Sequence, residues 1–152
     1  MNISKFVNKD LVFLNQEFDT NSELFEFVGA EANDLGVAKE SYADALKERE
    51  ANFPTGLELE NFGVAIPHSD SIHINEEFIS VVTLDKPVQF SSMEDLSKNL
   101  DVRLVFVLGL KKAEDQLSIL QAIISVIQDE SKVEKLISAA SSDEVLEILE
   151  NN

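Results

Sequence analysis

The composition of the chain excludes several classes of function. Its 152 residues include 29 acidic and 12 basic side chains, and the resulting formal charge of −17 is spread along the sequence, so nucleic acid would be repelled. The absence of cysteine rules out disulfides, thiolate metal sites and cysteine nucleophiles. Because no stretch has the apolar length of a membrane helix or the pattern of a signal peptide, we expect one cytoplasmic domain, residues 1–152, without membrane insertion.

The amino-terminal part of the chain predicts a strand and two helices. The apolar run 11–14 is typical of a short strand. A helix that ends near Gly36 follows it, with N-cap candidates Asp19, Thr20, Asn21 and Ser22. A second helix is predicted over 40–52, and the Phe-Pro-Thr-Gly sequence at 53–56 ends it because proline and glycine favour turns.

Three apolar runs then predict strands, at 63–66, 78–84 and 104–110. The last run is almost continuously apolar, which is typical of a central strand covered on both faces. Apolar residues in 117–127 recur at helical spacing and widen into a broad stripe, so we expect a well-buried helix.

Two shorter helices close the chain. Their apolar positions are Val133, Leu136 and Ile137, then Val145, Leu146, Ile148 and Leu149 behind the N-cap candidates Ser142 and Asp143. Since helices come before, between and after the strands, the sequence predicts an α/β domain with helical layers on both faces of a sheet.

The stretch FGVAIPHSD, residues 62–70, places His68 directly after a proline. Pro67 has a fixed φ and keeps Ile66 extended, so the imidazole emerges at a strand end, where α/β sheets usually bind ligands. A neutral imidazole nitrogen is a nucleophile near pH 7. The alternative is a capping or core histidine with a local hydrogen bond, and the residues alone slightly favour it.

Arg49 is a candidate for contact with a phosphoryl group. Its neighbours at i±3 and i±4 carry no carboxylate, so the guanidinium is free to bond a phosphoryl oxygen, or a carbonyl or acid elsewhere in the fold. The other arginine, Arg103, precedes the apolar strand and is expected to be structural. Lys47 lies three residues from both Asp44 and Glu50 and is expected to form a surface ion pair.

Two further polar residues suit an anion. Gln116 lies in the first turn of the long apolar helix, where free N–H groups attract negative charge, and Thr55 offers a turn hydroxyl. The alternatives are an ordinary helix-start residue and an ordinary turn residue. His73 follows His68 by five residues with Asp70 between them, but this set lacks the ligands of a catalytic zinc site, so no metal is expected.

The run EREANFPTGLELENFGVAIPHSD, residues 48–70, resembles the active-site region of the IIA components of the bacterial phosphoenolpyruvate-dependent sugar phosphotransferase system, in the fructose/mannitol/galactitol superfamily. The shared hallmark is an apolar-Ala-apolar-Pro-His stretch, here 64–68. The resemblance covers nearly the whole chain. The galactitol-type IIA proteins are the most similar, because they share the Phe-Pro-Thr-Gly turn and a second histidine five residues after the first.

The resemblance implies the mannitol/fructose-type IIA fold, a mixed sheet between two helical layers. It implies that His68 accepts a phosphoryl group, at Nε2, from the phosphocarrier protein HPr and passes it to a cysteine of a IIB component. That component acts with a membrane IIC component, and no cofactor is needed. Arg49, Gln116, His73 and Thr55 would support the phosphoryl group.

Two departures from the family pattern bear on this interpretation. Ser69 stands where many relatives have glycine, and Gln116 stands where they often have a second histidine, so either Gln116 or His73 would steady the phosphorylated ring. Family members that regulate other proteins through their phosphorylation state offer an alternative function. A binding module with an inert histidine is a third.

Overall fold

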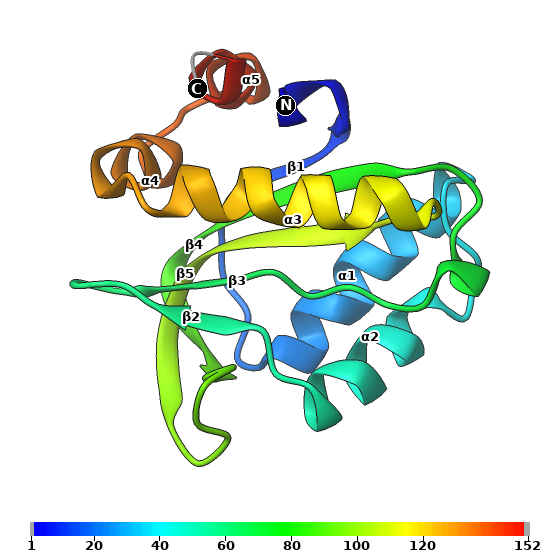
Figure 1. The fold of residues 1–152 in the computed structure, drawn as a ribbon, viewed down its shortest axis with the longest axis horizontal. Helices are drawn as coiled ribbons and strands as arrows, with labels where there is room; N and C mark the ends of the chain where they lie inside the picture. The colour runs from blue at the N-terminus through cyan, green and yellow to red at the C-terminus, as the bar shows by residue number, and fades with distance from the viewer. Residues whose placement is uncertain (1, 151–152) are drawn as a thin grey trace.

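The computed structural model describes residues 2–150, whose strands form one mixed five-stranded sheet in the order β1-β4-β5-β3-β2 (Figure 1). β1 pairs parallel with β4, β4 antiparallel with β5, β5 parallel with β3, and β3 antiparallel with β2. The strands are β1 (Val7–Gln16), β2 (Gly56–Glu58), β3 (Gly63–Ala65), β4 (Phe78–Ser91) and β5 (Asn99–Gly109). The predicted central position of the strand at 104–110 is confirmed.

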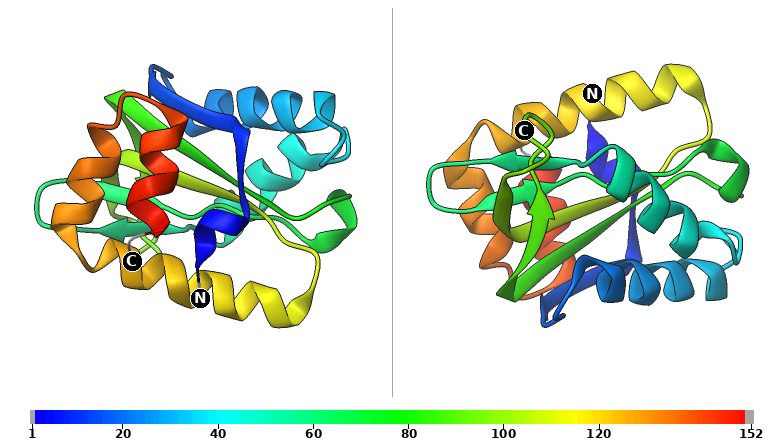
Figure 2. Two further views of the ribbon diagram at one scale, coloured as in Figure 1. Left: turned by 90° about the horizontal axis from the view of Figure 1, so that it is seen from above. Right: turned by 90° about the horizontal axis from the view of Figure 1, so that it is seen from below.

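Helices cover both faces of this sheet, which confirms the predicted three-layer α/β fold (Figures 1 and 2). One face carries α1 (Asn21–Asp34) and α2 (Tyr42–Asn52). The other carries α3 (Ala113–Ile127), α4 (Glu130–Ile137) and α5 (Ser142–Glu150), with the 3-10 turn η1 (Ile3–Lys5) beside α5. A second 3-10 turn, η2 (Ser71–His73), lies in the loop between β3 and β4.

The side chains of β5 point alternately to the two faces of the sheet, so this strand contributes to the apolar core on both sides. Leu104, Phe106 and Leu108 pack on the side of α3, whereas Val105 and Val107 pack on the side of α1 and α2. All of these side chains are buried, as expected of a strand whose successive residues point to opposite covered faces. Burial of each large apolar side chain contributes roughly 1.5–3 kcal/mol. Burial on both faces therefore stabilises the sheet between its helical layers.

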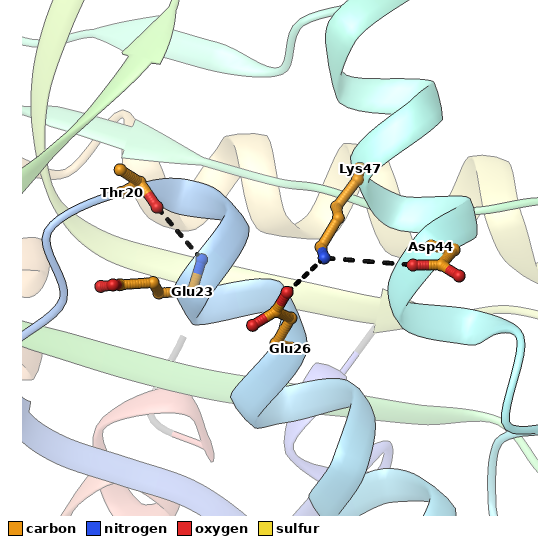
Figure 3. A network of polar contacts seen from close by, with 5 residues as sticks. All are labelled: Thr20, Glu23, Glu26, Asp44 and Lys47. Atoms are coloured by element: carbon orange, nitrogen blue, oxygen red, sulfur yellow. Dashed lines mark hydrogen bonds and ion pairs between the residues drawn. The ribbon is translucent and has the colours of Figure 1, made fainter.

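Capping interactions set the limits of α1, and an ion pair joins this helix to α2. The Thr20 hydroxyl accepts a hydrogen bond from the Glu23 N–H at 3.3 Å, and Gly36 adopts a φ of 78° just after the helix, which a side chain would disfavour. Lys47 of α2 reaches Glu26 of α1 at 2.6 Å (Figure 3). This contact links the two helices at the surface.

The expected surface pair of Lys47 is confirmed for Asp44, at 4.0 Å (Figure 3). It is wrong for Glu50. The Glu50 side chain is 6% exposed and points inward to Thr55. Helical spacing placed Glu50 correctly beside Lys47 along the helix, but it could not show that the last turn of α2 meets the following turn. The buried contact takes the carboxylate away from the surface.

The expectation that the helix at 117–127 is well buried is wrong in part. Its inward stripe consists of Ile119, Ile123, Val126 and Ile127, but Leu117 and Ile124 are 62% and 39% exposed. Only one side of α3 meets the sheet, because nothing in residues 2–150 covers its outer face (Figure 2). The apolar stripe is thus wider than the surface against which it packs.

The sheet topology places the candidate site at the carboxyl ends of two neighbouring strands. β3 and β5 are parallel, so their carboxyl ends lie together, and the Leu108 N–H donates to the Pro67 carbonyl at 2.9 Å just beyond β3. The chain after β3 runs to the end of the molecule where α3 begins (Figure 1). His68 therefore emerges at a strand end, as predicted.

Candidate active site

His68 is held in one tautomer by a backbone carbonyl. Its Nδ1 lies 3.1 Å from the carbonyl oxygen of Ile66. A carbonyl can only accept a hydrogen bond, so Nδ1 must carry the proton and donate it. The other nitrogen, Nε2, then has a free lone pair. The ring is half-buried at the rim of the sheet rather than sealed in the core.

The surroundings of His68 favour its neutral form. Burial is the main cause that lowers the pKa of the imidazole, and the positive charge of Arg49 lowers it further, whereas the Ile66 carbonyl and Asp70 oppose the shift. A ring with a pKa below its ordinary value of 6.5 is mostly neutral at pH 7. The lone pair on Nε2 is therefore available.

Arg49 lies near His68 with some of its donors unused. Its Nη1 is 3.6 Å from Asp70 Oδ1, and its Cζ lies 5.3 Å from the centre of the Phe53 ring. Within the described residues its Nε is buried and has no hydrogen-bond partner. An unpaired buried donor costs free energy, so this guanidinium is well suited to bind an oxyanion.

Arg49 also lines a shallow hollow of about 200 Å³ beside the His68 strand end. The other lining residues are Ala45, Glu48, Asn52, Phe53, Asp70 and His73. His68 is not part of this lining, but Asp70 follows it by two residues and joins the hollow to the strand end. The hollow is thus an extension of the site around Arg49.

Thr55 and Glu50 support the site from inside. The Thr55 hydroxyl donates to Glu50 Oε1 at 2.9 Å, and its backbone N–H donates to Glu50 Oε2 at 2.7 Å. The same hydroxyl accepts from the Ile66 N–H at 3.3 Å. Thr55 is 4% exposed, so its hydroxyl serves this internal chain of bonds rather than an external anion. Burial raises the pKa of Glu50 to about 7, against the opposing effect of the two Thr55 bonds.

His73 and Gln116 make no hydrogen bond or ion pair with His68 within the described residues. His73 Nδ1 is 2.7 Å from Ser41 Oγ, and its ring lines the hollow with Arg49. Gln116 is exposed in the first turn of α3, and its side chain makes no hydrogen bond within residues 2–150. The structure thus brings His68, Arg49 and Thr55 together around the end of β3 and gives Gln116 no contact with them.

Sequence reasoning missed three contributors to the site. Asp70 and Phe53 flank the Arg49 guanidinium, and Glu50 anchors Thr55. The spacing of Phe53 four residues after Arg49 on a helix was a usable signal. Arg103, in contrast, is structural as predicted, since its Nε and Nη2 donate to the Leu84 carbonyl at 3.2 and 3.1 Å.

The described part of the chain can also be compared with the requirements of a metal site and of a membrane-spanning helix. No group of three or more His, Cys, Asp or Glu side chains in it could hold a metal ion. None of its helices combines the length and the apolar character that a membrane span requires.

Fold and site together define a three-layer α/β protein with a neutral histidine, beside an arginine, at the edge of its sheet. The model of the family described as "Phosphoenolpyruvate-dependent sugar phosphotransferase system, EIIA 2" matches residues 5–152. The chain therefore belongs to this family of phosphotransferase system IIA components, which confirms the resemblance found in its sequence.

Individual relatives agree with this assignment. The galactitol-specific EIIA component of Escherichia coli is 32% identical over 133 residues, which span 88% of this chain and 85% of that protein. The crystal structure of IIA mannitol from Escherichia coli has a TM-score of 0.77 and 25% identity, covering 94% of this chain and 98% of that one. A complex of enzyme IIAMTL with phosphorylated enzyme IIBMTL, also from Escherichia coli, gives a TM-score of 0.79 and 24% identity, with 96% and 98% covered.

Proposed function

We propose that this chain is a cytoplasmic phosphocarrier in which His68 accepts a phosphoryl group from phospho-HPr and passes it to a cysteine of a IIB component. The whole chain, residues 1–152, acts as one IIA unit for uptake of a sugar or polyol through a membrane IIC component. Family membership supports the role, and the galactitol-specific relative supports a polyol such as galactitol. The neighbour solved with phosphorylated IIBMTL supports a IIB partner.

The single observation that carries the proposal is the 3.1 Å contact of His68 Nδ1 with the Ile66 carbonyl. It leaves the Nε2 lone pair free to attack phosphorus in line, while the bond from phosphorus to the donor histidine breaks and its electron pair returns to the donor ring. His68 loses no proton in this step. The Nδ1–H then donates to the carbonyl from a positively charged phosphoimidazole, which strengthens the bond.

Arg49 supplies the charge that a transferring phosphoryl group needs. Its unpaired Nε and its loose 3.6 Å pair with Asp70 leave donors for phosphoryl oxygens, and a planar guanidinium can bind two oxygens together. The step needs no metal or nucleotide. In the return step a IIB thiolate attacks phosphorus, and His68 Nε2 leaves with the electron pair of the broken bond.

Phosphate labelling tests the proposal directly. With labelled phosphoenolpyruvate, enzyme I and HPr, the wild-type chain should gain one acid-labile phosphate, which ¹⁵N NMR should place on His68 Nε2. His68→Ala should gain none, and His73→Ala, the matched control, should still be labelled. A galactitol-type IIB component should then take the label. Labelling of His68→Ala, or of Nδ1 in the wild type, would contradict the proposal.

A further inference from the structure

Glu50 is a buried acid whose two carboxylate oxygens both serve a single residue. It lies in the last turn of α2, is 6% exposed, and accepts the backbone N–H of Thr55 at 2.7 Å and the Thr55 hydroxyl at 2.9 Å. A buried carboxylate is costly unless it is well bonded, and a pair of apolar residues would hold a turn at lower cost. The position of this acid therefore calls for a reason other than stability.

The acid gives the next hydrogen bond a fixed direction. A hydroxyl has one proton, and Thr55 donates it to Glu50, so Thr55 Oγ1 meets the Ile66 N–H, 3.3 Å away, only as an acceptor. The Ile66 N–H can only donate, and as long as Glu50 accepts the Thr55 proton, the Thr55 oxygen stays available as its acceptor. This chain of bonds fixes the amide side of Ile66.

The carbonyl of the same residue orients the reactive ring. Ile66 C=O accepts the His68 Nδ1–H, and the next carbonyl, of Pro67, accepts the Leu108 N–H at 2.9 Å. Pro67 stiffens the backbone between these two carbonyls. Any movement of Ile66 would therefore change the acceptor that selects the tautomer of His68.

The acid also joins two parts of the site. Glu50 follows Arg49 directly on α2, so the bonds from Glu50 to Thr55 and on to Ile66 hold the end of the arginine helix against the end of β3. The relative position of the guanidinium and the imidazole depends on this connection. An error of about 1 Å in such a position can lower a reaction rate about 100-fold.

We propose that Glu50, acting through Thr55, is a positioning residue for phosphoryl transfer, because it fixes the Ile66 peptide that selects the His68 tautomer and the distance between Arg49 and His68. This inference rests on the proposed function for its kinetic consequence. Its structural consequence, the tautomer of His68 in the unphosphorylated protein, does not depend on that function.

Glu50→Gln is the main test, since it keeps the side-chain volume but presents an N–H group to one of the two Thr55 donors. We expect the maximal rate of phosphate acceptance from phospho-HPr to fall about 10-fold, with the KM for phospho-HPr within about twofold. The ¹⁵N shifts of the His68 ring should show an Nε2–H population that the wild type lacks. Asp44→Asn, on the same helix with a 92% exposed side chain, is the control for the lost charge and should change neither readout.

A second pair of variants tests the relay without changing the acid. Thr55→Val removes the hydroxyl and should reproduce both effects of Glu50→Gln, whereas Thr55→Ser keeps the hydroxyl and should restore most of the rate and the single tautomer. This pair decides the question even if Glu50→Gln fails to fold. Circular dichroism at the assay temperature confirms that each variant compared is folded.

The outcomes separate this inference from the proposed function. Unchanged rate and tautomer in folded Glu50→Gln, or in Thr55→Val, would overturn the positioning role and leave a purely structural one. If wild-type His68 gains no phosphate, the proposed function fails, yet the ¹⁵N shifts still decide whether Glu50 and Thr55 select the tautomer. A loss of thermal stability with neither effect also counts against the inference.

Discussion

The two histidines lie five residues apart, yet the groups that hold them differ in kind. His68 Nδ1 faces a backbone carbonyl, which can only accept a hydrogen bond, whereas His73 Nδ1 faces the Ser41 hydroxyl, which can donate or accept. The first partner selects one tautomer, and the second allows both. A reactive lone pair therefore depends less on the histidine itself than on the chemistry of its partner.

The second difference concerns the charge around each ring. Arg49 is close enough to His68 to lower the pKa of that ring, and it lines a hollow together with His73. Its buried Nε has no partner within the described residues, so the end of β3 has a free donor beside a free lone pair. At the η2 turn, in contrast, His73 Nδ1 is paired with the Ser41 hydroxyl at 2.7 Å. The comparison supports the proposal that His68 carries the chemistry and that His73 does not.

The largest expected effect comes from removal of the guanidinium. Arg49→Ala should lower the rate of phosphate acceptance about 100-fold, the order of loss seen when one transition-state donor is removed. Arg49→Lys should lower it about 10-fold, since an ammonium keeps the charge but loses the planar fork. Stopped-flow or quench measurements of labelled phosphate transfer from phospho-HPr would measure both rates.

Arg103→Lys is the matched control for these variants. Its guanidinium binds the Leu84 carbonyl, so the transfer rate should stay within about twofold. If Arg49→Lys transfers phosphate as fast as this control, the planar fork has no kinetic role. If Arg49→Ala does so too, the charge near His68 has none either, and the comparison of the two histidines rests on the tautomer alone. Unfolding curves in urea would show whether either change acts through stability.

The architecture could be predicted from sequence because periodicity records burial on each face of an element. The run at 104–110 indicated a central strand, and β5 occupies that place. β2 was missed because three residues carry too little pattern, and its pairing with β3 depends on the turn between them. The exposed Leu117 shows the converse limit, since a wide apolar stripe cannot reveal how much surface the sheet offers.

Sequence could predict the site only where a residue fixes the backbone conformation of its immediate neighbours. The Pro67–His68 pair is such a case, because proline fixes the local backbone. Asp70 and Glu50 became visible only in the structure, since each acts across a turn whose closure no spacing rule encodes. Phe53 differs, because its place four residues after Arg49 on a helix could have indicated the contact. The Thr55 hydroxyl was expected to be free for an anion, but tertiary packing turned it inward.

A pH series on Glu50 should give the next largest effect. Burial raises the pKa of Glu50 from 4.5 to about 7, so the folded state binds more protons than the unfolded state between these values. Stability due to this group is present below pH 4.5 and is lost as pH rises to 7, by up to about 3 kcal/mol. Urea unfolding of wild type and Glu50→Gln at several pH values should give a difference that changes with this sign, and a flat difference would contradict it.

His68 should show the opposite sign. Because its pKa in the folded state is lowered from 6.5, the unfolded state binds more protons below pH 6.5, and stability is lost as pH falls through that range. A ring titration followed by ¹H–¹⁵N NMR should therefore have its midpoint below 6.5, and His68→Gln should lose less stability on acidification than the wild type. A midpoint above 6.5 would mean that the ring is protonated near neutral pH and is a poor nucleophile.

The smallest expected effect concerns His73. Ser41→Ala removes the hydroxyl that holds Nδ1, and His73→Ala removes the ring, yet neither touches the Ile66 carbonyl or the Nε2 lone pair of His68. We expect the transfer rate to fall by no more than about threefold, the loss that corresponds to less than 1 kcal/mol in a transition state. The Lys39 N–H still binds the His73 backbone carbonyl, so the η2 turn should keep its place in both variants. A loss of tenfold or more in His73→Ala, with Ser41→Ala unaffected, would mean that the second ring contacts the phosphoryl group itself, and the division of roles between the two histidines would have to be abandoned.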